Sequence, residues 1–348
     1  MATLHRQLGL AAGVLWLFQA TTGTLIVFHW ELSDLSASAA HRPTDLGAIG
    51  QRIAAVNSDG SGRRVTALWT SDGLADRFDM FISGSATRAG ETIRIAGDGA
   101  PLRVRPEGAR GVTGTLVSLH HDLLVPPFGR WLLGVSGLLL LSNLAVGLAM
   151  ALPRTGTWRK ALVPRKAGPL PTRLYGWHRA IGLIAALPAL LTVGSGVLLA
   201  FNKPIESLAG IDDPALASPT VPHGGDIGLA EAVHRALAEI PGSTLTAVKL
   251  PTETDRTYAV RLKEPGELAR AYGASMVFVD AGTGTVRGRF PASEMSGPQA
   301  LMAALFPLHS GGAGGTAGRV LVLAVGLWLA TMTVTGWLLW RARKVRRP

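Results

Sequence analysis

Four stretches of this chain are apolar and long enough to cross a lipid bilayer, and they limit its possible folds more than any other feature. They comprise residues 8–28, 131–152, 180–201 and 320–340. A helix needs about 20 apolar residues to span the hydrocarbon core of a bilayer, and no charged residue interrupts the middle of any of the four. Hydrophobic residues make up 47% of the sequence and charged residues only 16%, which is too apolar for a soluble domain of this length. The sequence therefore predicts an integral membrane bundle of four helices.

The formal net charge of +11 is concentrated in short segments next to the apolar stretches. The loop of residues 154–176 and the tail of residues 342–348 are rich in basic residues, and neither contains an acidic one. Because basic segments beside membrane spans are retained in the cytoplasm, we expect both termini and this loop on the cytoplasmic side. The charge thus indicates membrane topology, and we expect no nucleic-acid partner. The basic residues beside the spans are Arg154, Arg159, Lys160, Arg165, Lys166, Arg173, Arg341, Arg343, Lys344, Arg346 and Arg347.

The chain has no cysteine. Disulfides, iron–sulfur clusters and thioether-linked haem all need a thiol, so the sequence excludes these three. The first apolar stretch, at residues 8–28, is too long for the hydrophobic region of a signal peptide, and its counterpart at residues 180–201 is internal. We therefore expect the first stretch to be retained as a membrane span.

The sequence also repeats itself. The first apolar stretch aligns with the third, and the second aligns with the fourth. Each half therefore consists of a span, an external segment and another span, which predicts an internal duplication with a pseudo-twofold axis along the membrane normal. The superimposed pairs include His5 with His178, Gly23 with Gly196, His120 with His309 and Gly137 with Gly326.

Small and polar residues recur within the spans. Glycines there are typical of close helix packing in lipid, and polar side chains usually hydrogen-bond neighbouring helices. We expect the first role for Gly23, Gly137, Gly196 and Gly326, although a flat macrocycle would also need small neighbours. We expect the second role for Gln19, Thr22, Asn143 and Thr335.

The repeat predicts the domain boundaries. We expect membrane helices within residues 1–30, 129–153, 177–202 and 319–341, with the basic loop at residues 154–176 and the tail at residues 342–348. Residues 31–128 and 203–318 would form two external α+β domains. The second has an amphipathic pattern at residues 229–240, and neither shows a recognisable group of nucleophile, base and orienting residue. Alternating or β-branched runs predict strands at residues 64–69, 77–82, 91–95, 244–250, 257–263 and 275–280.

Histidines occupy matching ends of the predicted spans, and this pattern points to metal coordination. A neutral imidazole donates a nitrogen lone pair to iron, so two histidines from facing helices can hold a porphyrin between them. His5 and His178, each followed by an arginine, would form one pair at the cytoplasmic ends of the first and third spans. His120 and His309 would form a second pair on the external side. We therefore expect two non-covalent haem b groups, one near each membrane face.

Two further histidines compete for the external site. His29 ends the first span, about 36 Å from His5 along a helix that rises about 1.5 Å per residue. It would ligate iron in place of His120, or contact substrate. His121 follows His120 directly and would exchange roles with it in a loop. Histidines without a matched partner are expected to be surface residues; they are His41, His223 and His234.

Several motifs resemble the PepSY-associated transmembrane family, whose members are bacterial inner-membrane proteins often linked to iron uptake. They are the His-Arg pairs that open the first and third spans, PLHSG at residues 307–311, TGWLLW at residues 335–340 and the hairpin FVDAGTG at residues 278–284. The last is similar to the PepSY domain signature. The resemblance covers nearly the whole chain. It implies two large periplasmic PepSY-like domains on the membrane bundle, and some members of the family resemble di-haem ferric-siderophore reductases.

These features together predict an inner-membrane oxidoreductase. Electrons from a quinol or a cytoplasmic reductase would enter at the His5–His178 haem, cross the lipid bilayer, and reduce a ferric siderophore or other ferric chelate. Iron would be released because Fe(II) is held less tightly by hard oxygen ligands. A plain electron conduit for a partner protein would share the haems. The alternative is a non-enzymatic, membrane-anchored PepSY binding or regulatory protein without a cofactor.

Overall fold

The computed structural model of the protein divides the chain into two compact units, each built from both halves of the sequence. Unit 1 comprises Met1–His29, Gly111–Leu208 and Ala304–Pro348, and unit 2 comprises Trp30–Arg110 and Ala209–Ala303. The structure describes residues 1–35, 41–71, 74–86, 88–153, 155–164, 167–212, 214–216, 224–268 and 272–344. Arg154, Arg165, Lys166, His223, Arg346 and Arg347, named above, lie outside the described residues.

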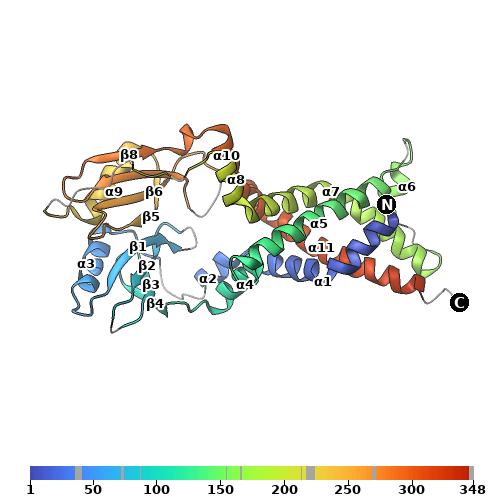
Figure 1. The fold of residues 1–348 in the computed structure, drawn as a ribbon, viewed down its shortest axis with the longest axis horizontal. Helices are drawn as coiled ribbons and strands as arrows, with labels where there is room; N and C mark the ends of the chain where they lie inside the picture. Colours follow the sequence, from blue (N-terminus) through green and yellow to red (C-terminus); the bar gives the residue numbers. More distant parts are fainter. Residues whose placement is uncertain are drawn as a thin grey trace. The chain divides into compact units, whose positions relative to one another are not determined.

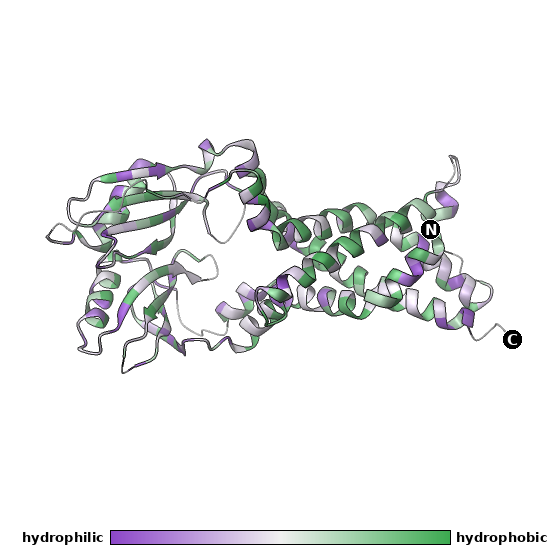
Figure 2. Cartoon of the chain, viewed as in Figure 1, coloured by the Kyte–Doolittle hydropathy of each residue, from purple (hydrophilic) through white to green (hydrophobic). Residues whose placement is uncertain are grey.

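Unit 1 is built on long apolar helices. Within the described residues, four helices are long and apolar enough to cross a membrane, and Figure 2 shows hydrophobic residues along them. The expectation of four membrane helices is therefore confirmed. All four begin earlier than the corresponding apolar stretches, and in α1 and α7 this earlier start places His5 and His178 inside the helices rather than before them. The four are α1 (Ala2–Ile26), α5 (Phe128–Ala151), α7 (Leu170–Ala200) and α11 (Gly315–Lys344) (Figure 1).

The four long helices pack in a ring, with α1 against α5, α5 against α7, α7 against α11 and α11 against α1. Glycines allow close approach in this ring. A Cβ atom added at Gly137 on α5 would lie 2.6 Å from Val197 on α7, and one added at Gly326 on α11 would collide with Thr24 on α1. Helices in lipid associate closely where small residues meet, so the packing role expected for these two glycines agrees with the structure.

Shorter helices accompany the ring. They are α4 (Gly111–Asp122), α6 (Trp158–Leu162), α8 (Asn202–Leu208) and α10 (Gly297–Ser310). α4 packs against α1 and α5. The sequence assigns α4 and α10 to the external segments, whereas the structure groups α4 and the C-terminal half of α10 with the long helices. This grouping positions the site, because α4 carries His120 and His121 and α10 carries His309.

Unit 2 is built on one antiparallel sheet of eight strands in the order β4-β3-β2-β1-β5-β6-β7-β8 (Figure 1). The two halves of the sequence meet where β1 pairs with β5, with Ala67 opposite Lys249 and Trp69 opposite Ala247. The two external segments therefore share a single sheet. The strands are β1 (Arg64–Thr70), β2 (Arg77–Ser83), β3 (Glu91–Ala96), β4 (Pro101–Pro106), β5 (Thr244–Lys249), β6 (Thr257–Lys263), β7 (Ser275–Asp280) and β8 (Val286–Phe290).

The core of unit 2 lies between the sheet and two helices, α3 (Leu46–Asn57) and α9 (Gly228–Glu239), which pack against β1 and against β5 to β8 respectively. Apolar residues recur every three or four positions along α9, as an amphipathic helix requires, and every second position along β6. The buried residues of these two elements are Leu229, Ala232, Val233, Ala236, Tyr258, Val260 and Leu262. A shorter helix, α2 (His29–Leu35), leads into the unit.

Elements occur in the same order in both halves of the chain. A long helix, a short helix, a third helix, four strands, another helix and a second long helix run from α1 to α5, and the same series runs from α7 to α11. The small helix α6 lies between the two series.

The turn between β7 and β8 is fixed by one carboxylate. Asp280 accepts hydrogen bonds from the backbone N–H groups of Gly282 and Thr283, both at 2.9 Å. Gly284 has a φ of +73°, which glycine adopts without strain. Burial opposes ionisation of Asp280, but the N–H groups of Thr283 and Gly282 outweigh it and lower the pKa of the carboxyl. The hairpin expected from the sequence is therefore present.

We expect Asp280→Ala to destabilise this hairpin by about 1–2 kcal/mol, because two backbone N–H groups lose their acceptor. Hydrogen–deuterium exchange of the full-length protein in detergent should show faster exchange at residues 282–290, whereas Glu239→Ala, an exposed change on α9, should leave it unchanged. Because folding lowers the pKa of Asp280, its contribution is complete above the pKa of the unfolded carboxyl and is lost as the pH falls through the folded-state pKa. Equal exchange in both variants would contradict this role.

Candidate functional site

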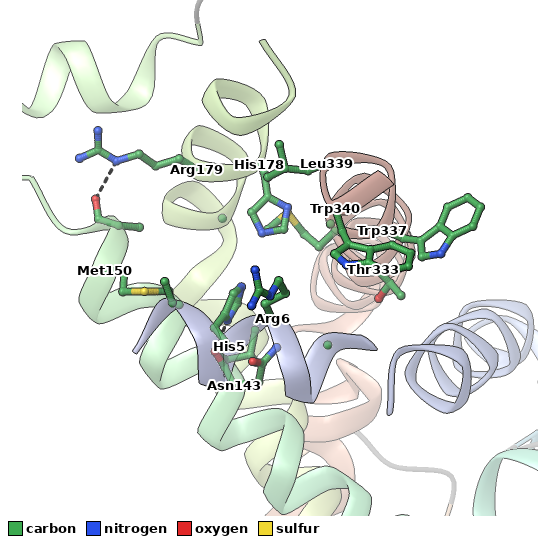
Figure 3. A pocket seen from close by; sticks show the side chains of 18 of the residues that line it. His5, Arg6, Asn143, Met150, His178, Arg179, Thr333, Trp337, Leu339 and Trp340 are labelled. Atoms are coloured by element: carbon green, nitrogen blue, oxygen red, sulfur yellow. Dashed lines mark hydrogen bonds between the residues drawn. The ribbon is translucent and has the colours of Figure 1, made fainter. Parts of the chain in front are cut away.

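His5 on α1 and His178 on α7 meet inside unit 1 (Figure 3). The centres of their rings are 6.1 Å apart and the ring planes are inclined by 71°. Both side chains line a cavity of about 470 Å³ whose walls come from α1, α5, α7 and α11. Pockets for cofactors and small ligands typically measure about 300–1,000 Å³. The cavity is therefore large enough for a cofactor beside the two imidazoles.

Each of these imidazoles is oriented through Nδ1. Nδ1 of His5 lies 3.1 Å from the backbone O of Asn143 on α5, and Nδ1 of His178 lies 3.2 Å from Oγ1 of Thr335 on α11. A carbonyl oxygen accepts only, so Nδ1 of His5 carries the proton and Nε2 keeps its lone pair. Histidines that ligate metals are commonly held by such a second hydrogen bond.

Glycines let both imidazoles lie directly against a neighbouring helix. A Cβ atom added at Gly147 on α5 would lie 2.9 Å from Cε1 of His5, and one added at Gly336 on α11 would lie 3.6 Å from Cε1 of His178. Gly147 and Gly336 occupy matching positions in the two halves, 27 residues after His120 and His309. In each half of the chain, therefore, a glycine of the second long helix lies next to the histidine of the first long helix.

The cavity lining carries positive charge. Its lining includes Arg6 and Arg179, each directly after one of the histidines, and Arg343 and Lys344 at the end of α11. No acidic residue occurs among the described residues that line it. Nε of Arg179 donates a 3.0 Å hydrogen bond to the backbone O of Ala151, drawn as a dashed line in Figure 3. Most of the remaining wall is apolar, so the cavity suits a flat apolar ligand that carries carboxylates.

A second pair of imidazoles is formed by His120 on α4 and His309 on α10. The centres of their rings are also 6.1 Å apart, and the planes are inclined by 29°. Nδ1 of His120 lies 3.2 Å from Oγ1 of Thr22 on α1, and Nδ1 of His309 lies 2.8 Å from the backbone O of Thr192 on α7. Nδ1 is thus engaged in all four histidines, and Nε2 is the nitrogen left for a ligand role.

The second pair also rests on glycines. A Cβ atom added at Gly23 on α1 would lie 2.7 Å from Cε1 of His120, and one added at Gly196 on α7 would lie 2.7 Å from Cε1 of His309. Nε2 of Gln19 donates a 2.6 Å hydrogen bond to the backbone O of His120, which ties α4 to α1.

Burial favours the neutral form of both histidines of the second pair. Desolvation lowers the pKa of His120 to about 3, although its ring keeps some exposed surface, and the neighbouring His309 and His121 lower the pKa further. Desolvation also lowers the pKa of His309. Neutral imidazole is the form that binds metal ions.

The spacing within each pair matches coordination of one metal ion from both sides. An imidazole nitrogen binds a first-row metal ion at about 2.0–2.1 Å, so two imidazoles on opposite sides of one ion have ring centres about 6 Å apart. The separation is 6.1 Å in both pairs. In the described part of the chain, no third His, Asp or Glu completes either pair to a group of three ligands. The His5–His178 pair, which lines a cavity between four helices, would therefore be able to hold the haem expected from the sequence.

The two pairs lie at different depths of the bundle. Along α1, His5 and Gly23 are 18 residues apart, and Gly23 contacts His120. Along α7, His178 and Gly196 are also 18 residues apart. At about 1.5 Å per residue this spacing is about 27 Å, close to the hydrocarbon thickness of about 30 Å.

The three histidines considered for the external site lie in different surroundings. His120 is the residue that faces His309, and the ring of His121 lies 6.0 Å from that of His120 on the same helix. His29 is the first residue of α2, and its Nδ1 lies 2.5 Å from the backbone O of Ile26, the last residue of α1. In unit 2, His41 and His234 are exposed, as expected.

Several residues of the site do not follow from local sequence patterns. No local pattern marks Thr192, Gly147 or Gly336, and the positions of Gly23 and Gly196 also suit helix packing, although all five residues lie against an imidazole. One signal was available: the spacing between histidine and glycine is the same in both halves.

Comparison with known proteins agrees with this architecture. A search of curated proteins finds no match to the chain. The family described as PepSY-associated TM region matches residues 2–343, which is essentially the whole sequence. The chain therefore belongs to the PepSY-associated transmembrane family.

Proposed function

We propose that the protein is a haem-containing membrane oxidoreductase that moves electrons across the bilayer to a ferric chelate, such as a ferric siderophore, and so aids iron release. The observation that carries this proposal is the equal separation of the two histidine pairs, with ring centres 6.1 Å apart in each. Two further observations support it. Nδ1 of each of the four imidazoles has a polar partner on another helix, and each of the four rings lies next to a glycine. The two depths of the pairs suit a path from one membrane face to the other.

The protein's own residues would hold and orient the cofactor. His5 with His178, and His120 with His309, would each hold one haem b through Nε2, with Nδ1 anchored as described. Arg6 and Arg179 would neutralise the carboxylates of the group in the cavity. When bound, haem supplies reversible one-electron chemistry.

The proposed reaction is the transfer of one electron to each ferric ion. The chelated Fe(III) is reduced to Fe(II), and the electron donor, a quinol or a cytoplasmic reductase, is oxidised. Fe(II) is a softer ion than Fe(III), so hard oxygen ligands hold it less tightly and the iron is released.

We also propose that the chain is an internal duplication with PepSY-like segments in unit 2, in the bacterial inner membrane. The repeated order of elements and the matching histidine–glycine contacts support the duplication. Arg159, Lys160 and Arg173 follow α5 or begin α7, and Arg341 and Arg343 end α11. Basic residues at these ends favour a cytoplasmic location for both termini and a periplasmic location for unit 2.

A reporter fused after Pro348 tests this orientation. We expect a reporter that folds only in the cytoplasm to be active there, and one that folds only in the periplasm to be inactive, because the basic end of α11 is retained inside. The converse pattern, measured at equal expression, would overturn the topology.

The haem-to-protein ratio of the purified full-length protein tests the proposed function. We expect about two haem b groups per chain, sharp α and β bands after reduction, and reoxidation of the reduced protein by a ferric chelate. The gallium(III) form of the same chelate should not reoxidise it, because gallium(III) does not accept the electron. Colourless protein from haem-supplied cells would instead favour a binding or regulatory protein without a cofactor. Coloured protein that no ferric chelate reoxidises would favour an electron conduit.

A further inference from the structure

The four paired histidines share one kind of support, which recurs on four different helices. Each ring lies against a glycine. A helical side chain covers the turn that precedes it, so a glycine leaves the backbone carbonyl four residues earlier accessible to the ring. We call this carbonyl residue, the residue three positions after it and the glycine an imidazole cradle. The four cradles are Gln19, Thr22 and Gly23 for His120; Asn143, Val146 and Gly147 for His5; Thr192, Ser195 and Gly196 for His309; and Met332, Thr335 and Gly336 for His178.

In two of the imidazole cradles, Nδ1 of the ring faces the carbonyl itself. These contacts join His5 to Asn143 at 3.1 Å and His309 to Thr192 at 2.8 Å. A carbonyl oxygen has two lone pairs, so it can accept from the ring as well as from its own helix. Because this oxygen only accepts, both rings must donate from Nδ1, which leaves the lone pair on Nε2.

In the cradle of His178, a threonine hydroxyl lies between the ring and the carbonyl. Oγ1 of Thr335 lies 3.2 Å from Nδ1 of His178, 2.8 Å from the backbone O of Thr331 and 3.2 Å from the backbone O of Met332. A hydroxyl has one proton, and two oxygens 2.8 Å apart need that proton between them. The hydroxyl therefore donates to its own helix and accepts from Nδ1 of His178.

The cradle of His120 repeats this arrangement on α1. Oγ1 of Thr22 lies 3.2 Å from Nδ1 of His120, 3.0 Å from the backbone O of Phe18 and 3.1 Å from the backbone O of Gln19. Thr22 is 4% exposed, so its hydroxyl has little access to solvent. By the same reasoning this hydroxyl donates to α1 and accepts from Nδ1 of His120.

Each histidine pair therefore combines one ring that donates to a carbonyl with one ring that donates to a hydroxyl. Thr335 supplies the hydroxyl in the pair of His5 and His178, and Thr22 supplies it in the pair of His120 and His309. A hydrogen bond from Nδ1 makes an imidazole a stronger electron donor through Nε2. Second-shell hydrogen bonds of this kind are one of the means by which a protein sets the potential of haem.

Other threonines of the same helices show that the contact with histidine is additional to helix bonding. Thr21 on α1 and Thr331 on α11 are exposed, and each hydroxyl donates at 2.8 Å to the carbonyl four residues earlier. A threonine thus forms this bond without a histidine nearby. The approach of Nδ1 to Thr22 and Thr335 is what distinguishes these two positions.

We propose that Thr22 and Thr335 are positioning residues for the two proposed haem groups. Each hydroxyl keeps the proton of its histidine on Nδ1, directs Nε2 towards the iron and strengthens the electron donation of that imidazole. Stronger donation stabilises Fe(III), so each threonine lowers the reduction potential of one haem. This inference rests on the proposed function and deepens it, because it names the residues that set the energy of the transferred electron at each membrane face.

A redox titration of the full-length protein in detergent, followed by its visible spectrum, tests the proposal. In Thr335→Val a methyl group takes the place of the hydroxyl, and Nδ1 of His178 loses its acceptor. We expect the potential of one haem to rise and that of the other to stay unchanged. Thr335→Ser keeps a hydroxyl and should keep the parent potential. Thr22→Val should raise the potential of the other haem. The haem next to Thr335 is the one that disappears in His178→Ala.

The same helices provide matched controls. Thr331→Val and Thr21→Val make the same chemical change and remove the same kind of bond to the helix backbone, but away from the imidazoles. Both potentials should equal those of the parent protein in these two variants. A difference between Thr335→Val and Thr331→Val therefore reports the contact with His178.

A second measurement does not require haem. In full-length protein labelled with ¹⁵N-histidine, nuclear magnetic resonance distinguishes a protonated ring nitrogen from an unprotonated one. The signals of His178 are those missing in His178→Ala. We expect Nδ1 of His178 to be protonated in the parent protein and in Thr335→Ser. Its signals should shift in Thr335→Val and stay unchanged in Thr331→Val. This measurement decides the question if Thr335→Val loses its haem.

Three outcomes would overturn the proposal: an unchanged or lowered potential in a haem-containing Thr335→Val, an equal shift in Thr331→Val, or unchanged nitrogen signals of His178 in Thr335→Val. The proposed function fails separately. A colourless protein whose His178 signals respond to Thr335→Val alone would refute the proposed function and retain the positioning role. A di-haem protein whose potentials and nitrogen signals do not respond to either threonine would refute this inference alone.

Discussion

Replacing His178 by alanine is expected to remove one haem from each chain and to leave the other in place. His178 is half of the pair inside the 470 Å³ cavity, and a single remaining imidazole holds a porphyrin far less tightly than two. The haem-to-protein ratio should fall from about two to about one, because the pair of His120 and His309 lies about 27 Å away along the helices. The pyridine haemochrome assay on purified protein measures this ratio.

The companion variants make this result specific. His309→Ala should also remove one haem, and the double variant should remove both. His234→Ala, an exposed histidine on α9 of unit 2, should keep the full content. Loss of neither haem in His178→Ala, or of both with the fold preserved, would refute the assignment of two separate pairs.

Replacing Gly196 by alanine is expected to displace the imidazole of His309. The new Cβ would lie 2.7 Å from Cε1 and 3.0 Å from Nδ1 of that ring, whereas carbon atoms in contact prefer about 3.5–4.0 Å. The ring must move by about 1 Å, which disturbs the 2.8 Å contact of Nδ1 with Thr192 and the direction of Nε2. We expect one haem to be lost or to change from a low-spin to a high-spin spectrum.

The same helix provides a matched control. At Gly194, two residues earlier on α7, an added Cβ has no atom within 4 Å. Both substitutions change helix propensity by the same amount, about 1 kcal/mol in favour of alanine, so a difference between them reports the contact with His309. Electron paramagnetic resonance should show an altered signal only in Gly196→Ala. Identical spectra in the two variants would show that this glycine does not position the ring.

The sequence predicts the membrane helices well because length and apolar composition decide them. It also predicts most strands of unit 2, since alternation of buried and exposed residues is a local property. It misses β4, whose bounding Pro101 and Pro106 argue against a strand in the interior of a sheet. The structure places β4 at the edge of the sheet, where proline is tolerated.

The contacts between residues far apart in the chain cannot be predicted from the local sequence. Nothing local in β1 or β5 indicates that these strands pair, and the hydrogen bond from Thr70 to Thr246 joins residues 176 positions apart. The histidine pairs are an exception, because the repeat itself indicates which histidines correspond. Their supports, such as Thr192 under His309 and Gly147 beside His5, come from other helices and emerge only in the fold.

The pairing of β1 with β5 also has a consequence for synthesis of the protein. A ribosome completes β1 long before β5, and α5 and α7 must enter the bilayer in the interval. During that interval one edge of β1 offers unpaired backbone groups, and such edges promote aggregation. Successful biogenesis therefore depends on how soon translation of the second half follows the first, so slowing elongation between α5 and β5 should lower the yield of assembled protein.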